Sequence, residues 1–423
     1  MPAHHDAIAA VWRIESAKIV ASVARLVRDI GVAEELAQDA LVSALETWPH
    51  GGTPDKPGAW LMAAARNRAL DWLRHRRMAA GRLEELGLDL DAQEALIVPD
   101  FTDALDAARA DEIGDDLLRL IFTACHPLLP AEARVALTLK LLGGLSTQDI
   151  ARAFLVPEAT VAQRIVRAKR SLREARVPFE LPCGAVLGER LASVLEVVYL
   201  IFNEGYTATS GEDWMRPALT DEALRLGRML AALAAAEPEV MGLLALMELQ
   251  ASRSAARVDA QGQPVLLAEQ DRSRWDRLLI RRGLIALERA TALAGQAHEP
   301  PGPYALQAAI AACHARAARA AETDWPAIAA LYDTLAQAAP SPVVELNRAV
   351  AVGMAFGPQA GLAIIDALRD EPALRHYQWL PSVRADLLGK LGRLAEARAE
   401  WARAAALAGN ARERALLLAR AKP

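Results

Sequence analysis

The chain has 423 residues, of which 53% are hydrophobic, 24% charged and 5% aromatic, so it is long and apolar enough for several folded domains, and general disorder is excluded. Alanine, leucine, arginine and glutamate, all good helix formers, fill most windows, and the expected fold class is therefore all-α. The formal net charge of -5 excludes coating of nucleic acid through bulk positive charge, and charge has to be considered segment by segment.

The sequence predicts neither a membrane anchor nor a redox or metal centre. No apolar run reaches the roughly 18 residues that a membrane span needs, and the N-terminus lacks a basic-then-apolar signal pattern, so we expect a cytoplasmic protein without membrane contact. The cysteines, Cys125, Cys183 and Cys313, are odd in number and far apart. This spacing predicts free thiols rather than a disulfide framework or a metal site, and no cofactor is expected.

The first 80 residues predict one small helical domain. Helical patterns cover about 6–30, 32–48 and 55–77, and they are separated by Gly31 and by the turn cluster from Pro49 to Pro57. In the second helix the side chains expected to pack inward are Leu36, Ala40, Ala44 and Trp48, and those expected to face outward are Glu35, Gln38, Asp39 and Val42. An exposed strip that is acidic and apolar is typical of a protein-docking face or of a solvated helix side, and the residues alone leave both open.

The third helix of this domain is strongly basic. Positions 66 to 77 hold five arginines and one acid, a local charge of +4. Trp60 and Trp72 lie among these bases, and an aromatic ring beside cations suits unstacked single-stranded bases, although core packing explains either tryptophan equally well. The candidate DNA contacts on this helix are Arg66, Asn67, Asp71, Arg74 and Arg77.

A strongly acidic stretch follows. Between Glu84 and Asp116 there are twelve acids and one arginine, a local charge of -11. With Gly87, Pro99 and few periodic apolar residues, residues 81–112 predict an extended or loosely structured linker. A second helical unit is expected over 113–177.

The segment from Gly144 to Arg170 predicts two helices joined by a tight turn. Ser146 with Asp149 three residues later forms a capping-box pattern, and Pro157 suits the first turn of the second helix. The predicted buried stripe of that second helix consists of Val161, Ile165, Ala168 and Leu172.

The opposite side of that second helix carries hydroxyl, amide and guanidinium groups. In the major groove arginine reads guanine and glutamine reads adenine, while further bases hold phosphate. The candidate base contacts are Thr160, Gln163 and Arg164, and the candidate phosphate contacts are Arg167, Lys169 and Arg170. A solvated basic face on an ordinary helical hairpin is the alternative.

After Pro178 and Pro182 the sequence becomes rich in alanine and leucine. Amphipathic segments are expected near 186–203, 220–235, 238–255, 271–294 and 304–321, which makes 178–300 a helical middle region. Within 301–423, Tyr332, Ile365 and Trp401 recur at spacings of 33 and 36 residues. The pattern loosely matches tetratricopeptide (TPR) repeats and predicts stacked helix pairs, although alanine-rich helices also produce weak repeats by chance.

Together these segments resemble the extracytoplasmic-function (ECF) subfamily of sigma-70 factors. The run Glu34–Ala40 resembles the polymerase-binding helix of sigma domain two, with Glu35, Gln38 and Asp39 at motif positions. The run Ala59–Asp71 resembles the helix that recognises and opens the minus-10 element, and Leu145–Arg170 resembles the domain-four helix-turn-helix that reads the minus-35 element. The resemblance implies that 1–80 is domain two and 113–177 is domain four.

The resemblance also implies partners and a function. The expected partners are core RNA polymerase and promoter DNA, and the acidic linker becomes either an electrostatic mimic of nucleic acid or a solvated spacer. The remaining chain, including the run Tyr199–Tyr206, resembles a subgroup with a TPR-like C-terminal extension, which implies regulation in cis or a regulatory protein as a further partner. A DNA-binding regulator with a helical sensor domain is the main alternative. An enzyme in the C-terminal half is disfavoured because no nucleophile elbow, phosphate loop or metal spacing occurs there.

Overall fold

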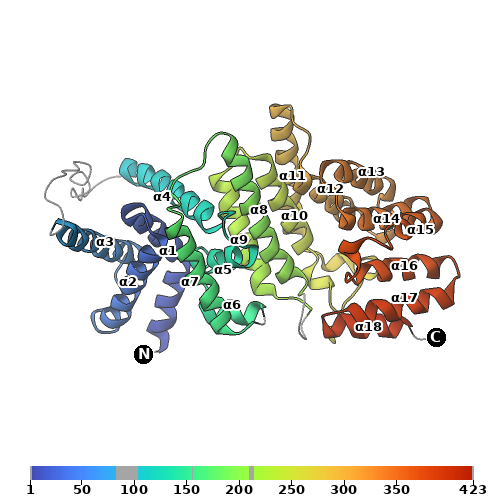
Figure 1. The fold of residues 1–423 in the computed structure, drawn as a ribbon, viewed down its shortest axis with the longest axis horizontal. Helices are drawn as coiled ribbons and strands as arrows, with labels where there is room; N and C mark the ends of the chain where they lie inside the picture. The colour runs from blue at the N-terminus through green and yellow to red at the C-terminus, as the bar shows by residue number, and fades with distance from the viewer. Residues whose placement is uncertain (1, 82–102, 155, 209–213, 422–423) are drawn as a thin grey trace. The chain divides into compact units, whose positions relative to one another are not determined.

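The computed structural model describes residues 2–81, 103–154, 156–208 and 214–421 (Figure 1). Over these residues the regular elements are α-helices and short 3-10 helices, with one isolated β-bridge between Val258 and Pro264, so the expected all-α class is confirmed. The chain forms two compact units, residues 1–197 and 198–423, and the boundary falls within helix α8 (Ala185–Tyr206).

The first unit contains seven helices and the beginning of α8. They are α1 (Pro2–Val27), α2 (Ile30–Gly51), α3 (Pro57–Gly81), α4 (Asp103–Ala124), α5 (Ala131–Leu141), α6 (Thr147–Phe154) and α7 (Glu158–Glu174). The first three pack on one another, α4 lies along α1, and α5, α6 and α7 pack together.

The break between α1 and α2 lies at Arg28 and Asp29 rather than at Gly31. Arg28 has a left-handed backbone (φ 55), and the Asp29 carboxylate caps α2 by accepting from the backbone N–H of Gly31 at 2.8 Å and of Val32 at 3.2 Å. Gly31 is therefore inside the first turn and buried. At the other end α2 continues through Pro49 and is closed by a hydrogen bond from Gly52 N–H to the Trp48 carbonyl, 3.0 Å.

Helix α4 begins at Asp103, well before residue 113, where the sequence predicted the helical segment 113–177 to start. Residues 103–112 are helical, whereas the sequence predicted an extended linker there; residues 82–102 of that linker lie outside the described part of the chain. Asp116 of the acidic stretch is buried, with its side chain 2% exposed, and pairs with Arg25 at 3.2 Å and Arg119 at 2.7 Å. One acid of the stretch thus fastens α4 to α1 instead of facing solvent.

The second unit contains the end of α8 and ten further α-helices. They are α9 (Pro217–Leu233), α10 (Pro238–Ala251), α11 (Arg277–Ala297), α12 (Pro303–Arg316), α13 (Trp325–Ala338), α14 (Pro342–Phe356), α15 (Pro358–Ala367), α16 (Trp379–Lys390), α17 (Leu394–Leu407) and α18 (Ala411–Ala421). The short 3-10 helices are η3 (Ser254–Ala256), η4 (Leu267–Glu269), η5 (Arg272–Arg274), η6 (Ala320–Glu322) and η7 (Pro372–Leu374). Six of these α-helices have proline in their first two positions, where its missing N–H costs nothing.

From α13 onward each helix packs on the next one in the chain, from α13 through α18 (Figure 1). Tyr332, Ile365 and Trp401 lie on α13, α15 and α17, the first helix of each pair. The three residues thus fall on alternate helices of the stack, and the prediction of TPR-like helix pairs stays a prediction.

The run Tyr199–Tyr206 fastens the end of α8 inside the second unit. A Cβ on Gly205 would lie 2.4 Å from the backbone nitrogen of Thr220 in α9, so only glycine fits there. The neighbouring Glu204 is buried and forms an ion pair with Arg216. The Arg257 guanidinium lies 3.4 Å from the centre of the Tyr206 ring and donates to the Tyr206 carbonyl at 2.7 Å.

Candidate nucleic-acid interface

Helices α6 and α7 form the predicted helix-turn-helix. The capping box is confirmed: the Asp149 N–H donates to Ser146 Oγ at 3.0 Å, and the Ser146 N–H donates to the Asp149 carboxylate at 3.3 Å. Gly144 enters the motif with φ 63, a conformation that strains most other residues. The buried side of α7 consists of Val161, Ile165, Ala168 and Leu172, as the spacing predicted.

The predicted DNA contacts on α7 fall into two groups. Gln163, Arg167 and Arg170 are exposed and follow one another at intervals of four and three residues, which places them on one helix face. Thr160 and Arg164 are half-buried beside this face, and Arg164 forms an ion pair with Glu132 of α5. The exposed group remains available to a ligand, whereas Arg164 would have to exchange a carboxylate for a base or a phosphate.

Lys169 does not share that exposed face. It is half-buried and forms an ion pair with Glu34 of α2, whose carboxylate is 8% exposed and also lies 3.7 Å from Lys140. One turn further on, Arg173 Nε donates to Asp29 Oδ2 at 2.7 Å. The basic face of α7 is therefore divided: one side is open, and the other is held against the start of α2.

These contacts hold Asp29 ionised. Burial alone would raise the pKa of the Asp29 carboxyl, but the hydrogen bond from Arg173 and those from the backbone N–H groups of Val32 and Gly31 outweigh it, so the pKa lies below its usual 3.8. Local sequence patterns gave no sign of the pairing, because 144 residues separate its two members.

The outward side of α2 is as predicted. Glu35, Gln38, Asp39 and Val42 are exposed. Gln38 Nε2 donates to Glu34 Oε1 at 2.8 Å, so the exposed strip is connected to the buried carboxylate that holds Lys169.

On α3 the candidate residues Asn67, Asp71, Arg74 and Arg77 are exposed, and Arg66 is half-buried. Arg74 and Asp71 form an exposed ion pair of 2.9 Å, which is worth little in water and is readily exchanged for a phosphate contact.

The two tryptophans of α3 have different surroundings. Trp60 packs edge-on against the buried Trp48 of α2, with ring centres 5.4 Å apart. Trp72 is half-buried with the Arg76 guanidinium 5.1 Å from its ring centre. Trp60 thus belongs to the packing of α2 on α3, and Trp72 is the better candidate for stacking on an unpaired base.

Two polar groups of the first unit are unsuited to chemistry. Burial raises the pKa of the Cys125 thiol to about 11, so it is not a thiolate at neutral pH. Burial and the nearby Arg190 lower the pKa of His126 to about 4. The cysteines are free thiols, as expected, and among the described residues no group of three or more His, Cys, Asp or Glu side chains could hold a metal ion.

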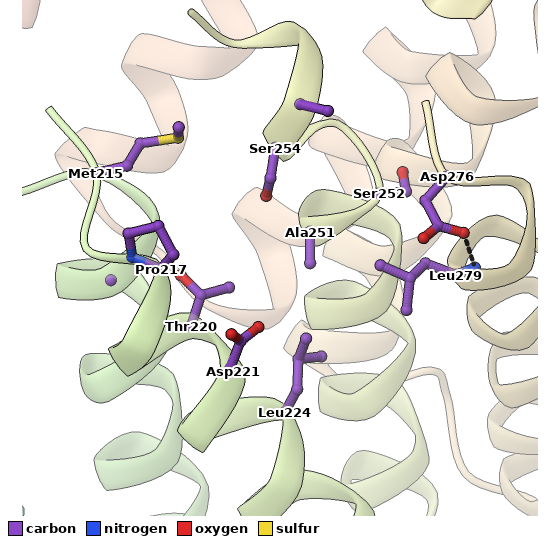
Figure 2. Close-up of a pocket in the computed structure, with 12 residues that line it drawn as sticks. Met215, Pro217, Thr220, Asp221, Leu224, Ala251, Ser252, Ser254, Asp276 and Leu279 are labelled. Atoms are coloured by element: carbon purple, nitrogen blue, oxygen red, sulfur yellow. Dashed lines mark hydrogen bonds between the residues drawn. The ribbon is translucent and has the colours of Figure 1, made fainter. Parts of the chain in front are cut away.

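A small pocket of about 240 Å³ lies in the second unit beside the start of α9. Figure 2 shows Asp221 and Asp276 among its lining residues, and the dashed line marks the hydrogen bond from the Leu279 N–H to Asp276. Asp276 caps α11 through this bond and a second one from the Leu278 N–H, and Ser252 Oγ donates to the Leu249 carbonyl at 2.7 Å. These two polar groups are thus used for helix capping and loop structure.

The helix-turn-helix with an open basic face, preceded by a second helical segment with a basic face of its own, has the architecture of a two-domain DNA-binding protein. Comparison with known families matches residues 15–78 to sigma-70 region 2, residues 119–172 to sigma-70 region 4, and residues 190–291 to a family of unknown function, DUF6596. None of the described helices is long and apolar enough to cross a membrane.

Several curated proteins are similar to the chain. An uncharacterized protein of Rhizobium meliloti is 46% identical over 394 residues, covering 93% of this chain and 90% of that protein. The RNA polymerase sigma-H factor of Pseudomonas aeruginosa is 30% identical over 38% of this chain and 81% of its own length. The probable ECF RNA polymerase sigma factor SigI of Mycobacterium tuberculosis is 29% identical over 41% of this chain, and the match spans 57% of SigI, less than two thirds. No solved structure matches the chain.

The chain belongs to the sigma-70 family of RNA polymerase sigma factors, in its ECF subfamily.

Proposed function

We propose that the protein binds core RNA polymerase and directs it to promoters, and that its C-terminal extension regulates this activity in cis. The observation that carries the proposal is the order of the matches: sigma-70 region 2 covers α2 and α3, and sigma-70 region 4 covers the helix-turn-helix. Both matched segments leave charged side chains exposed at the motif positions.

Each exposed face has a distinct task in this proposal. The strip Glu35, Gln38 and Asp39 docks on the polymerase. The face of α3 around Asn67 and Arg74 captures the melted minus-10 strand, and α7 holds the minus-35 duplex. The contacts on α7 are Thr160, Gln163 and Arg164 to bases, and Arg167, Lys169 and Arg170 to phosphates. Two weak readers at a fixed spacing select a promoter more sharply than either alone.

The two readers cannot reach their elements while α7 remains on α2. The positions in their names place the minus-35 and minus-10 elements about 25 base pairs apart, which is about 85 Å at a rise of about 3.4 Å per base pair. In the structure, Lys169 and Arg173 of α7 instead form ion pairs with Glu34 and Asp29 of α2. Docking on the polymerase therefore has to open these pairs, which also frees Lys169 for the phosphate contact that the sequence predicted.

The remaining parts have proposed roles as well. The acidic linker, whose residues 82–102 lie outside the described part of the chain, mimics nucleic acid in a polymerase channel. The extension replaces a separate regulator or binds a regulatory protein. As a sigma factor the protein acts in the cytoplasm, where the polymerase is.

Docking is tested by capture of purified core polymerase. We expect Asp39→Arg to reduce capture at least tenfold, because it reverses the charge in the middle of the docking strip. Glu180→Arg, which makes the same change at an exposed acid outside the strip, is the control and is expected to bind normally. Equal capture of both variants would contradict the docking assignment.

Regulation in cis is tested by truncation. The site of truncation matters because the first part of α8 makes contacts that stabilise the first unit. A cut at Pro182 removes Arg190, which donates to the Phe122 carbonyl at 2.7 Å, and Ser193, which donates to the Cys125 carbonyl at 2.5 Å. A chain ending at Val197 keeps these contacts and loses the second unit. A change in transcription shared by both truncations is due to the extension, and a change confined to the shorter chain is due to damage to the first unit. If the 197-residue chain supports the same amount of transcription as the full chain, the extension has no regulatory role.

A further inference from the structure

A second cavity in the second unit has a volume of about 680 Å³. Its walls come from the loop around η4, the junction of α12 and α13, and helices α14, α16, α17 and α18, so successive helix pairs share it. The volume falls within the range of about 300–1,000 Å³ typical of sites for small organic ligands.

The wall of this cavity is mainly apolar and unusually aromatic. The chain has nine tryptophans, five of them after residue 198, and four of those five line the cavity: Trp214, Trp325, Trp379 and Trp401. Trp379 and Met354 remain 38% and 41% exposed there. Large apolar side chains that stay exposed in a concave site are typical of ligand binding. A ligand that covers them removes apolar surface from water, which is favourable.

Two ion pairs neutralise three of the charged side chains that line the cavity. Lys390 and Asp386 form an ion pair of 2.8 Å. Arg420 lies 3.5 Å from Glu269 and 5.3 Å from the centre of the Trp401 ring. These paired side chains therefore offer no free counter-ion that would compensate a charged ligand for its lost hydration.

Arg272 is held by neutral acceptors rather than by a carboxylate. Its guanidinium donates to the carbonyls of His314 and Ala317 at 2.8 and 2.7 Å, and to Thr323 Oγ1 at 3.0 Å. These bonds fix the loop that forms one wall, and the Arg272 Nε–H is left without a partner among the described residues. Glu413, an acid in the same wall, offsets the charge of Arg272, so the two favour a ligand without net charge.

Two polar side chains of the wall keep unused hydrogen-bonding capacity. His314 Nδ1 and Glu413 Oε1 are buried, and neither has a hydrogen-bond partner among the described residues. Burial, with Arg253 and Arg272 nearby, lowers the pKa of His314 to about 4, so its ring is neutral at physiological pH and offers a donor or an acceptor without a charge.

We propose that this cavity binds a neutral, largely apolar small molecule with an aromatic ring and one or two hydrogen-bonding groups. The tryptophans supply the contact area, and the polar groups orient the ligand. The site would make the extension a receptor for a hydrophobic compound, a property that the family assignment does not supply.

The test uses the full chain and the fluorescent probe N-phenyl-1-naphthylamine, which is neutral, aromatic and carries one N–H. We expect saturable binding with a dissociation constant on the order of 10 µM, and a value weaker than about 100 µM overturns the proposal. Its sulfonated analogue, 8-anilinonaphthalene-1-sulfonate, has the same ring system with one added sulfonate group, which brings a negative charge, and is expected to bind at least tenfold more weakly. Equal or tighter binding of the sulfonate overturns the assigned ligand class.

The location is tested by filling the cavity. Ala321 and Ala268 line it and are exposed, so Ala321→Phe and Ala268→Phe add bulk without disturbing the core. Each is expected to weaken probe binding at least tenfold at an unchanged melting temperature. Ala402→Phe makes the same change at an exposed position outside the cavity and should bind like the parent. If both lining variants bind the probe as tightly as Ala402→Phe does, the cavity is not the site.

Discussion

Breaking the ion pair between Asp29 and Arg173 should tighten binding to core polymerase. In the proposed function this pair stabilises only the closed form, in which α7 rests on α2, and the polymerase selects the open form. The apparent dissociation constant is the intrinsic constant divided by the fraction of open molecules. Weakening the closed form therefore raises the apparent affinity.

The magnitude follows from the geometry of the pair. Arg173 Nε lies 2.7 Å from Asp29 Oδ2, and a second nitrogen lies 3.4 Å from Oδ1, but the Arg173 side chain is 59% exposed. Solvent screening limits such a pair to about 0.2–1 kcal/mol, and the two-point contact favours the upper end. A loss of about 1 kcal/mol corresponds to an approximately fivefold gain in core affinity.

Asp29→Asn and Arg173→Gln each remove the pair, and asparagine still caps α2, so the helix start is preserved. Core affinity is measured by titration with labelled protein for both single variants and for the double variant. We expect each single variant to gain affinity and the double variant to gain no more than either one. If the gains in core affinity of the two single variants simply add in the double variant, or if all three variants bind like the parent, the pair does not stabilise a closed form.

Acid should weaken the same contact. Because the folded pKa of Asp29 lies below its ordinary value of 3.8, the ionised form stabilises the fold above that value, and the contribution is lost as the pH falls through the folded pKa. The Asp29→Asn variant should lack this part of the acid sensitivity. A urea-unfolding series between pH 5 and pH 2 measures the difference.

Three further predictions concern single residues. Arg167→Ala, on the open face of α7, should lower the slope of the salt dependence of holoenzyme–promoter binding by about 1 without changing the melting temperature; an unchanged slope would exclude a phosphate contact. The pKa of His314 should be close to 4 by NMR titration, so the second unit should lose stability as the pH falls from 6.5 toward 4, and His314→Gln should flatten that loss. Gly205→Ala should cost about 1–3 kcal/mol of unfolding free energy because its Cβ would meet the Thr220 backbone, whereas Gly188→Ala on the same helix, with open space around it, should be neutral or stabilising.

Local features could be predicted well from the sequence. The buried stripe of α7 and the outward residues of α2 follow from helical periodicity, and the capping box of α6 follows from two residues three positions apart. These features depend on interactions within one or two turns, which sequence spacing encodes directly.

Features that depend on distant contacts could not be predicted. Lys169 looks like a phosphate contact by its charge and position, and only the packing of α7 against α2 brings it to the buried Glu34. Asp116 belongs to an acidic stretch whose composition suggested a solvated segment, and only the packing of α4 on α1 brings it to Arg25. The tryptophan-lined cavity likewise gathers residues that are spread over some 200 positions of the sequence.

The most direct measurement is run-off transcription from genomic DNA with purified core polymerase and the purified full chain as the only sigma factor. We expect discrete transcripts that share a minus-35 and a minus-10 element, and we expect Arg164→Ala and Arg74→Ala to abolish them. Transcripts that appear only when a housekeeping sigma factor is added would contradict the proposed function and would make the protein a DNA-binding regulator instead.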